Sequence, residues 1–207
     1  MTAAQDEPLS VLDLIQSRRS RGKMLPDEPP RRLVEQVLAA AVHAPNHHDT
    51  QPWRFFVLTG AARNRLGDAL ADALTQRLNG TDSFDPAQDR PAKLEGLVMA
   101  ERAKPLRSPV LIVVGVSAEA DDPMTRREDL QAASAALQNM LLAAHSLGLA
   151  AIWRTGDGAY DASVKAHFSL RPQDEIAGIL YLGYPNPSIA EPPARSRDFE
   201  DKTEWRD

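Results

Sequence analysis

An unbroken aliphatic run, Pro109–Val116 (PVLIVVGV), constrains the fold of this 207-residue chain more than any other feature. A strand with one wet face alternates apolar and polar residues, whereas this run is apolar and largely β-branched throughout. It therefore predicts a central strand that is buried on both faces. Strands separated by helices indicate an α/β or α+β fold, and their spacing leaves the pairing direction open.

Hydrophobic periodicity and capping residues place the other elements along the chain. Helices are expected after Ser10 to about Ser17, from Pro30 to about Val42 or His43, from Gly60 through Leu74, and at about 93–102, 128–147 and 162–168. Strands are expected at Arg54–Leu58, Ala150–Trp153 and Ile176–Leu182, and residues 155–158 are expected to turn. Gly148 is placed to end the helix 128–147. The tail from 185 is rich in proline and charge, and its Trp205 suggests docking.

Composition excludes several classes of function. The chain has no cysteine, which rules out disulfides, thiolate metal sites and cysteine nucleophiles, so that any redox chemistry requires a bound cofactor. The net charge is −5 and no basic patch interleaves with aromatics, which argues against nucleic acid as a partner. No apolar run is long enough to span a bilayer and no secretion signal is visible, so we expect a cytoplasmic protein without a membrane partner.

The connection at residues 43–56 (HAPNHHDTQPWRFF) has the composition of a ligand-facing loop. A structural connection needs only a few turn residues, whereas this one carries three imidazoles, amides and an indole. Loops on rigid scaffolds carry function disproportionately often. The alternative is a well-capped loop that buries Trp53.

A metal site in this loop is disfavoured. His43 and His47 have the spacing of two ligands on one helical face, but Pro45 lies between them and breaks that geometry. His48 and Asp49 follow directly, and adjacent residues rarely converge on one ion. We therefore expect no metal, and a metal-dependent hydrolase built on this cluster remains an alternative.

Two further segments carry candidate ligand groups. Arg18-Arg19-Ser20 offers two guanidiniums and a hydroxyl at a helix exit, which suits a phosphate, although a solvated basic helix terminus explains it equally well. Trp153-Arg154-Thr155-Gly156 follows a strand, where ligands bind in α/β folds, although a strand end with a core Trp explains it too. The motifs GxGxxG, GxxxxGK[ST], GxSxG and HExxH are absent from the sequence.

In their order and spacing, these segments resemble the nitroreductase family of flavoproteins. The segments are Arg18-Arg19-Ser20, Ala44–Trp53, Ile152–Gly156 (IWRTG) and Ile179–Pro185 (ILYLGYP). The similarity extends from about Val11 to Pro185 and is strongest to the compact YdjA-like subgroup. It implies an α+β fold, a three-layer α/β/α-like sandwich with a central mixed sheet flanked by helices. It also implies a homodimer that binds FMN at its interface, with residues 1–185 as the FMN-binding domain and 186–207 as an extension docked on the dimer.

The resemblance also implies roles for individual residues. Arg18, Arg19 and Ser20 would hold the FMN phosphate, ribityl chain and one ring edge, His43 and His47 would contact FMN, and Gln51 and Trp53 would support their loop. Trp153, Arg154 and Thr155 would lie along the isoalloxazine ring. Arg197 would be a further phosphate ligand, and His145, Ser146 and Gly148 fall in a stretch assigned to NAD(P) in the subgroup. Members of the subgroup often have Arg at the position of His43. In this chain a titratable imidazole therefore replaces a permanent cation.

The implied activity is that of an NAD(P)H-dependent flavin oxidoreductase. NAD(P)H would donate a hydride, and a small acceptor such as a nitroaromatic or quinone would then occupy the same place in a ping-pong cycle. No side chain is required as a proton donor, so we expect no catalytic acid from the protein. A flavin-binding protein with little turnover, acting in sensing or cofactor handling, is the competing interpretation. The sequence does not choose NADH over NADPH, nor does it name the acceptor.

Overall fold

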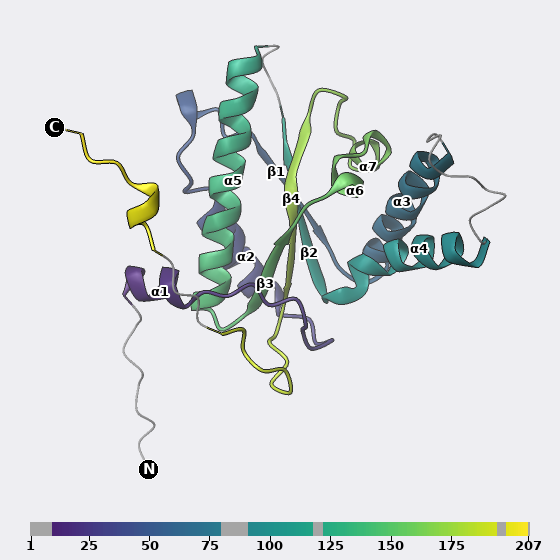
Figure 1. Ribbon diagram of the computed structural model, residues 1–207, viewed down its shortest axis with the longest axis horizontal. Coiled ribbons are helices and arrows are strands. Elements are labelled where there is room, and N and C mark those ends of the chain that lie inside the picture. The colour runs from purple at the N-terminus through teal and green to yellow at the C-terminus, as the bar shows by residue number, and fades with distance from the viewer. Residues whose placement is uncertain (1–9, 80–90, 118–121, 194–197, 207) are drawn as a thin grey trace.

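The computed structural model describes residues 10–79, 91–117, 122–193 and 198–206, and it is built around one sheet (Figure 1). The strands are β1 (Trp53–Leu58), β2 (Val110–Val116), β3 (Ala150–Arg154) and β4 (Glu175–Gly183), in the order β1-β2-β4-β3. The predicted α+β class is confirmed. The prediction of a mixed sheet is wrong for the described strands, because β1–β2, β2–β4 and β3–β4 all pair antiparallel.

Helices cover both faces of the sheet (Figure 1). On one face pack α2 (Arg31–Ala41) and α5 (Pro123–Ser146), and α1 (Val11–Ser17) lies against α5. The other face carries α3 (Gly60–Asn79), α4 (Pro91–Ala103), α6 (Asp157–Tyr160) and α7 (Ala162–His167). Each residue of β2 is buried: Ile112 and Val114 point into the α2/α5 core, whereas Leu111 and Val113 point into the other. The predicted central strand is thus confirmed.

Most element boundaries agree with the sequence-based expectation, and two differ for local reasons. Helix α5 begins at Pro123 rather than near 128, because the Asp122 side chain accepts a hydrogen bond from the Thr125 amide and caps the helix. Residues 157–160, expected to belong partly to a turn, form the single-turn helix α6. Short 3₁₀ turns lie at η1 (His47–Asp49), η2 (Lys104–Arg107) and η3 (Glu200–Lys202). None of the described helices combines the length and apolar composition that crossing a membrane requires.

Neighbouring residues of β3 point to opposite faces of the sheet. The Trp153 indole packs into the α2/α5 core, and its Nε1–H donates to the Ala177 carbonyl oxygen at 3.2 Å. Ile152 packs in the core on the other face, and Arg154 shares that face with it. The indole of Trp153 is therefore a core group, and Arg154 is the member of the pair that can reach a ligand on the α3/α4 side.

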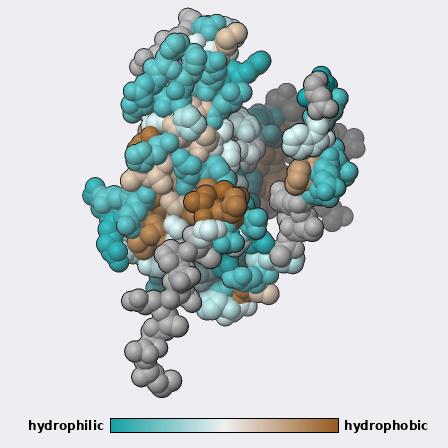
Figure 2. Space-filling model, turned by 90° about the vertical axis from the view of Figure 1, so that its left-hand side faces the viewer, coloured by the Kyte–Doolittle hydropathy of each residue, from teal (hydrophilic) through white to brown (hydrophobic). Residues whose placement is uncertain are grey.

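Apolar side chains are exposed along α1 and the tail. Val11, Leu12 and Ile15 of α1 are exposed, and Figure 2 shows apolar surface in the middle of the face on which α1 lies. The described tail residues 198–206 run away from the body of the protein (Figure 1), with Trp205 86% exposed. Docking of the tail on a second copy, and the division into 1–185 and 186–207, stay predictions.

The packing of Trp153 predicts that Gly178 tolerates no side chain. A Cβ added at Gly178 would overlap the Trp153 indole, whereas a Cβ at Gly96 in α4 would meet nothing within 4 Å. Gly178→Ala should lower the free energy of unfolding in urea by about 1–3 kcal/mol, because the indole must leave its position. Gly96→Ala should be neutral or stabilising by about 0.5–1 kcal/mol. Equal effects of the two substitutions would contradict this packing.

Candidate functional site

The segment after α1 lies along the outer edge of β3. The Arg21 amide donates to the Ala151 carbonyl oxygen at 3.0 Å, which places residues 18–23 beside the strand. Gly22 passes close to Arg154, because a Cβ there would come within 3.1 Å of Nη2 of Arg154. Two motifs that are far apart in sequence, Arg18-Arg19-Ser20 and Trp153–Gly156, are therefore neighbours in the fold.

The arginines of this segment have different partners. Arg19 donates through Nη1 to the carbonyl oxygens of Gln16 and Arg18, at 2.6 and 3.0 Å, and so caps the end of α1. Nη1 of Arg18 lies 3.4 Å from the Ser20 hydroxyl. The guanidinium of Arg21 pairs with the Glu191 carboxylate. The helix-terminus interpretation thus describes Arg19, and Arg18 with Ser20 forms the pair that suits a phosphate.

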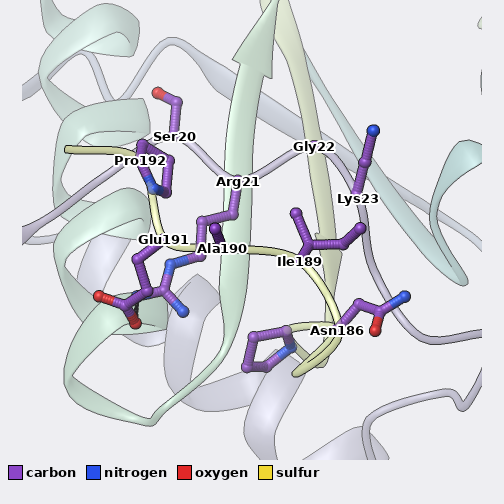
Figure 3. A pocket seen from close by; sticks show the side chains of 10 residues that line it. Ser20, Arg21, Gly22, Lys23, Asn186, Ile189, Ala190, Glu191 and Pro192 are labelled. Atoms are coloured by element: carbon purple, nitrogen blue, oxygen red, sulfur yellow. Dashed lines mark hydrogen bonds and ion pairs between the residues drawn. The ribbon is translucent and has the colours of Figure 1, made fainter.

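The tail segment after β4 folds back over these residues. Figure 3 shows Arg21 and Glu191 beside each other, and a cavity of about 100 Å³ lies between the two segments. Ser20, Lys23 and Asn186 also line it. Arg197, the phosphate ligand predicted in the tail, lies outside the described residues.

His145, in the last turn of α5, faces the same cations. Its Nε2 lies 2.9 Å from the Ser17 hydroxyl of α1. Burial lowers the pKa of His145 below its ordinary value, Arg21 and Arg18 lower it further, and Glu191 partly opposes them. Its neighbours have local roles: Ser146 donates to the Ala143 carbonyl, and Gly148, at φ +72°, ends the helix. Of the three residues predicted for NAD(P), only His145 faces the arginines.

A larger cavity, of about 280 Å³, lies beyond Arg154 on the α3/α4 face of the sheet. Thr155 and Gly156 line it together with Arg154, whose guanidinium carbon lies 5.4 Å from the centre of the Tyr181 ring. Burial raises the pKa of Tyr181, and Arg154 and Arg107 act in the opposite direction. The motif that ends β3 therefore opens onto a cavity bounded by a buried phenol.

Five polar residues of this cavity were not predicted as site residues from the sequence: Arg77, Glu101, Lys104, Asp157 and Tyr181. They come from α3, α4, η2, α6 and β4, and no local pattern marks them. Within the described residues, the buried Nε atoms of Arg77 and Arg154 have no hydrogen-bond partner. The Nε of Arg63, which does not line this cavity, is unsatisfied as well, and Arg77 pairs through Nη1 with Asp157 at 3.3 Å, so the cavity is marked by its charged lining rather than by these nitrogens.

The loop from His43 to Trp53 lies elsewhere. His43 and Gln51 are exposed, and Nε2 of His47 lies 3.8 Å from the Glu128 carboxylate of α5. Glu128 and His145 are on the same helix, and their separation corresponds to about 25 Å along its axis. Within one chain, His47 therefore lies far from Arg18.

The metal alternative gains no geometric support. The rings of His47 and His48 contact each other with centroids 4.0 Å apart, rather than converging on a common point. Among the residues that the structure describes, no three His, Cys, Asp or Glu side chains are grouped to hold an ion. A hydrolase built on this loop is therefore not proposed.

The arginines around His145 predict a pH dependence of stability. Because the pKa of His145 is lowered in the folded protein, the unfolded chain takes up more protons there as the pH falls through about 6.5. Relative to a His145→Gln variant, the wild type should lose stability from about pH 7 down to the lowered pKa and then level off. Urea unfolding at a series of pH values measures this, and a constant difference between about pH 8 and 5 would contradict it.

Comparisons with known proteins identify the family and the fold. The model of the nitroreductase family matches residues 15–184. The "Putative NAD(P)H nitroreductase YdjA" of Escherichia coli K12 is 32% identical over 177 residues, covering 86% of this chain and 89% of that protein. A crystal structure of a nitroreductase-like family protein from Bacillus cereus has a TM-score of 0.76 at 28% identity and covers 100% of this chain and 98% of its own.

A further solved structure carries a cofactor. It is a "putative nitroreductase in complex with FMN" from Desulfovibrio desulfuricans, with a TM-score of 0.66 and 25% identity, covering 96% of this chain and 98% of its own. The family match spans most of the chain and includes both motifs that meet at the edge of β3. The chain belongs to the nitroreductase family.

Proposed function

We propose that this protein is an FMN-dependent oxidoreductase that accepts a hydride from NAD(P)H and reduces small acceptors such as nitroaromatics or quinones. The D. desulfuricans relative was solved with FMN, and YdjA is named for NAD(P)H, which supports both cofactors. The observation that carries the proposal is that the Arg18–Gly22 segment pairs with β3 through Arg21 and passes close to Arg154, which lines a cavity at the end of that strand.

The residues at the outer edge of β3 fit FMN. The cofactor has a dianionic phosphate and a ring whose pyrimidine end offers several oxygen and nitrogen acceptors. Arg18 with Ser20 suits the phosphate, because a guanidinium and a hydroxyl supply charged and neutral donors together. Arg154 and Thr155 line the cavity and supply guanidinium and hydroxyl donors there. These groups would hold the acceptor-rich end of the ring.

When bound, FMN would supply the hydride and electron transfer that no side chain of this chain can perform. Arg154 would stabilise negative charge at the cavity, whereas the charge of Lys104 is offset by its ion pair with Glu101. The indole of Trp153, fixed to the Ala177 carbonyl and covered by α5, supports the strand end from behind. We assign no catalytic acid. One donor and one acceptor would use the same place in turn, in a ping-pong cycle.

We further propose that two copies of the chain share each FMN site. Arg18 lies near His145 at one end of α5, and His47 lies near Glu128 toward the other, about 25 Å apart by helix rise. A second copy placed against the first would bring its loop to the first copy's arginines. The exposed apolar residues of α1 and the exposed Trp205 of the tail provide surface for such a contact. Cytoplasmic location stays a prediction.

The proposed reductase activity predicts a spectrum and its response to nucleotide. Purified protein should show flavin absorbance, and stoichiometric NADH or NADPH should bleach it within seconds under anaerobic conditions. Adding a quinone or nitroaromatic should then restore the absorbance. A yellow protein that neither nucleotide bleaches would instead support the flavin-binding protein with little turnover.

The phosphate pairing predicts the effect of removing Arg18. Arg18→Ala should weaken FMN binding by about 1–3 kcal/mol, or roughly 5- to 150-fold in Kd, because a charged hydrogen bond is lost. Fluorescence quenching during titration of apo-protein with FMN measures this. Arg31→Ala is the control, since Arg31 is exposed and pairs with Glu35 one turn along α2. Equal FMN affinity of the two variants would count against the role of Arg18.

A further inference from the structure

The loop between α2 and β1 has an unusual backbone. His48, Asp49 and Gln51 have φ values of +49°, +54° and +44°, in the left-handed region that non-glycine residues rarely adopt. Such residues persist only where surrounding contacts determine their conformation, and they gather at functional sites. Contacts with the rest of the protein must therefore hold this loop in its shape.

Packing alone does not hold it. Thr50 and Gln51 border a cavity of about 420 Å³, which Asp129 of α5 also lines. The loop's amides are bonded within the loop: Gln51 N–H donates to Asn46 Oδ1 at 2.9 Å, and Thr50 N–H donates to the His47 carbonyl at 3.2 Å. These bonds shape the loop, but they do not attach it to the body of the protein.

Two contacts attach the loop: the Ser117 N–H donates to the Pro52 carbonyl oxygen at 2.8 Å, and α5 holds the residues before it. The Thr50 hydroxyl donates to Asp129 Oδ1 at 2.8 Å, a bond between residues 79 positions apart, and the neighbouring Glu128 lies 3.8 Å from His47. Asp129 is 2% exposed. Taking a carboxylate out of water is costly unless it accepts hydrogen bonds, and α5 could hold an apolar residue there at no such cost. The buried acid is thus explained by the loop, rather than by the helix.

We infer that Asp129 is a positioning residue, which through Thr50 holds His47 and Gln51 in the shape that meets the cofactor. This inference rests on the proposed function, since it assigns the loop to the flavin site. It adds a role for a residue that touches neither substrate nor cofactor. Asn46 and Asp129 then act together, one setting the turn and the other its place against α5.

Thr50→Val tests the inference, because it removes the hydroxyl and keeps the shape. Hydrogen exchange of the Thr50 and Gln51 amides in apo-protein should accelerate about tenfold, the effect of losing one charge-assisted bond. The Kd for FMN should rise by about three- to tenfold. Thr50→Ser, which keeps the hydroxyl, should restore both the slow exchange and the wild-type Kd. Asp129→Asn keeps a carbonyl acceptor. It should therefore accelerate loop exchange and raise the Kd for FMN less than Asp129→Leu does.

Thr75→Val is the matched control, since Thr75 also uses its hydroxyl in one bond, to the Ala71 carbonyl of α3. It should change neither loop exchange nor FMN affinity. Loop exchange in Thr50→Val equal to that in Thr75→Val would overturn the attachment. Faster exchange with unchanged FMN affinity would overturn the positioning role. A wild type that binds no FMN would overturn the proposed function, and the exchange data would still decide whether Asp129 holds the loop.

Discussion

The burial of β2 on both faces is the constraint on which the rest of the structure depends. Alternate residues of this strand enter two separate cores, so helices must cover the sheet on each side. Polar side chains that could bind a ligand therefore lie at the edges of the sheet. The free edge of β3 accepts the segment after α1 through the Arg21–Ala151 hydrogen bond, which brings the arginine-rich segment to the motif that ends β3.

Helix α5 organises the candidate site in a second way. Its last turn places His145 among the arginines, and its first half holds the loop before β1 through Asp129 and Glu128. Arg18 and the loop before β1 are thus held near opposite ends of the same helix. Their separation is therefore a built-in property of the chain, and a second copy is what would bring unlike ends together.

Local signals predicted most elements, because helix periodicity, the aliphatic strand and the capping residues act over short stretches of sequence. Pairing direction was not predictable in this way, since it depends on contacts between distant strands. Strand alternation could have separated Trp153 from Arg154, because adjacent residues face opposite sides of a strand. The cavity residues Arg77, Lys104 and Tyr181 converge only in the folded chain, so no motif could reveal them.

A mixed-dimer experiment tests the central claim, a flavin site shared between two copies, most directly. One chain would carry Arg18→Ala, the other would carry His47→Ala with Gln51→Ala, and each alone should bind FMN weakly. Hybrids formed by refolding the two together should bind one FMN per two chains with wild-type affinity, because one site receives both intact halves. Hybrids in which no FMN binds with wild-type affinity would contradict a shared site.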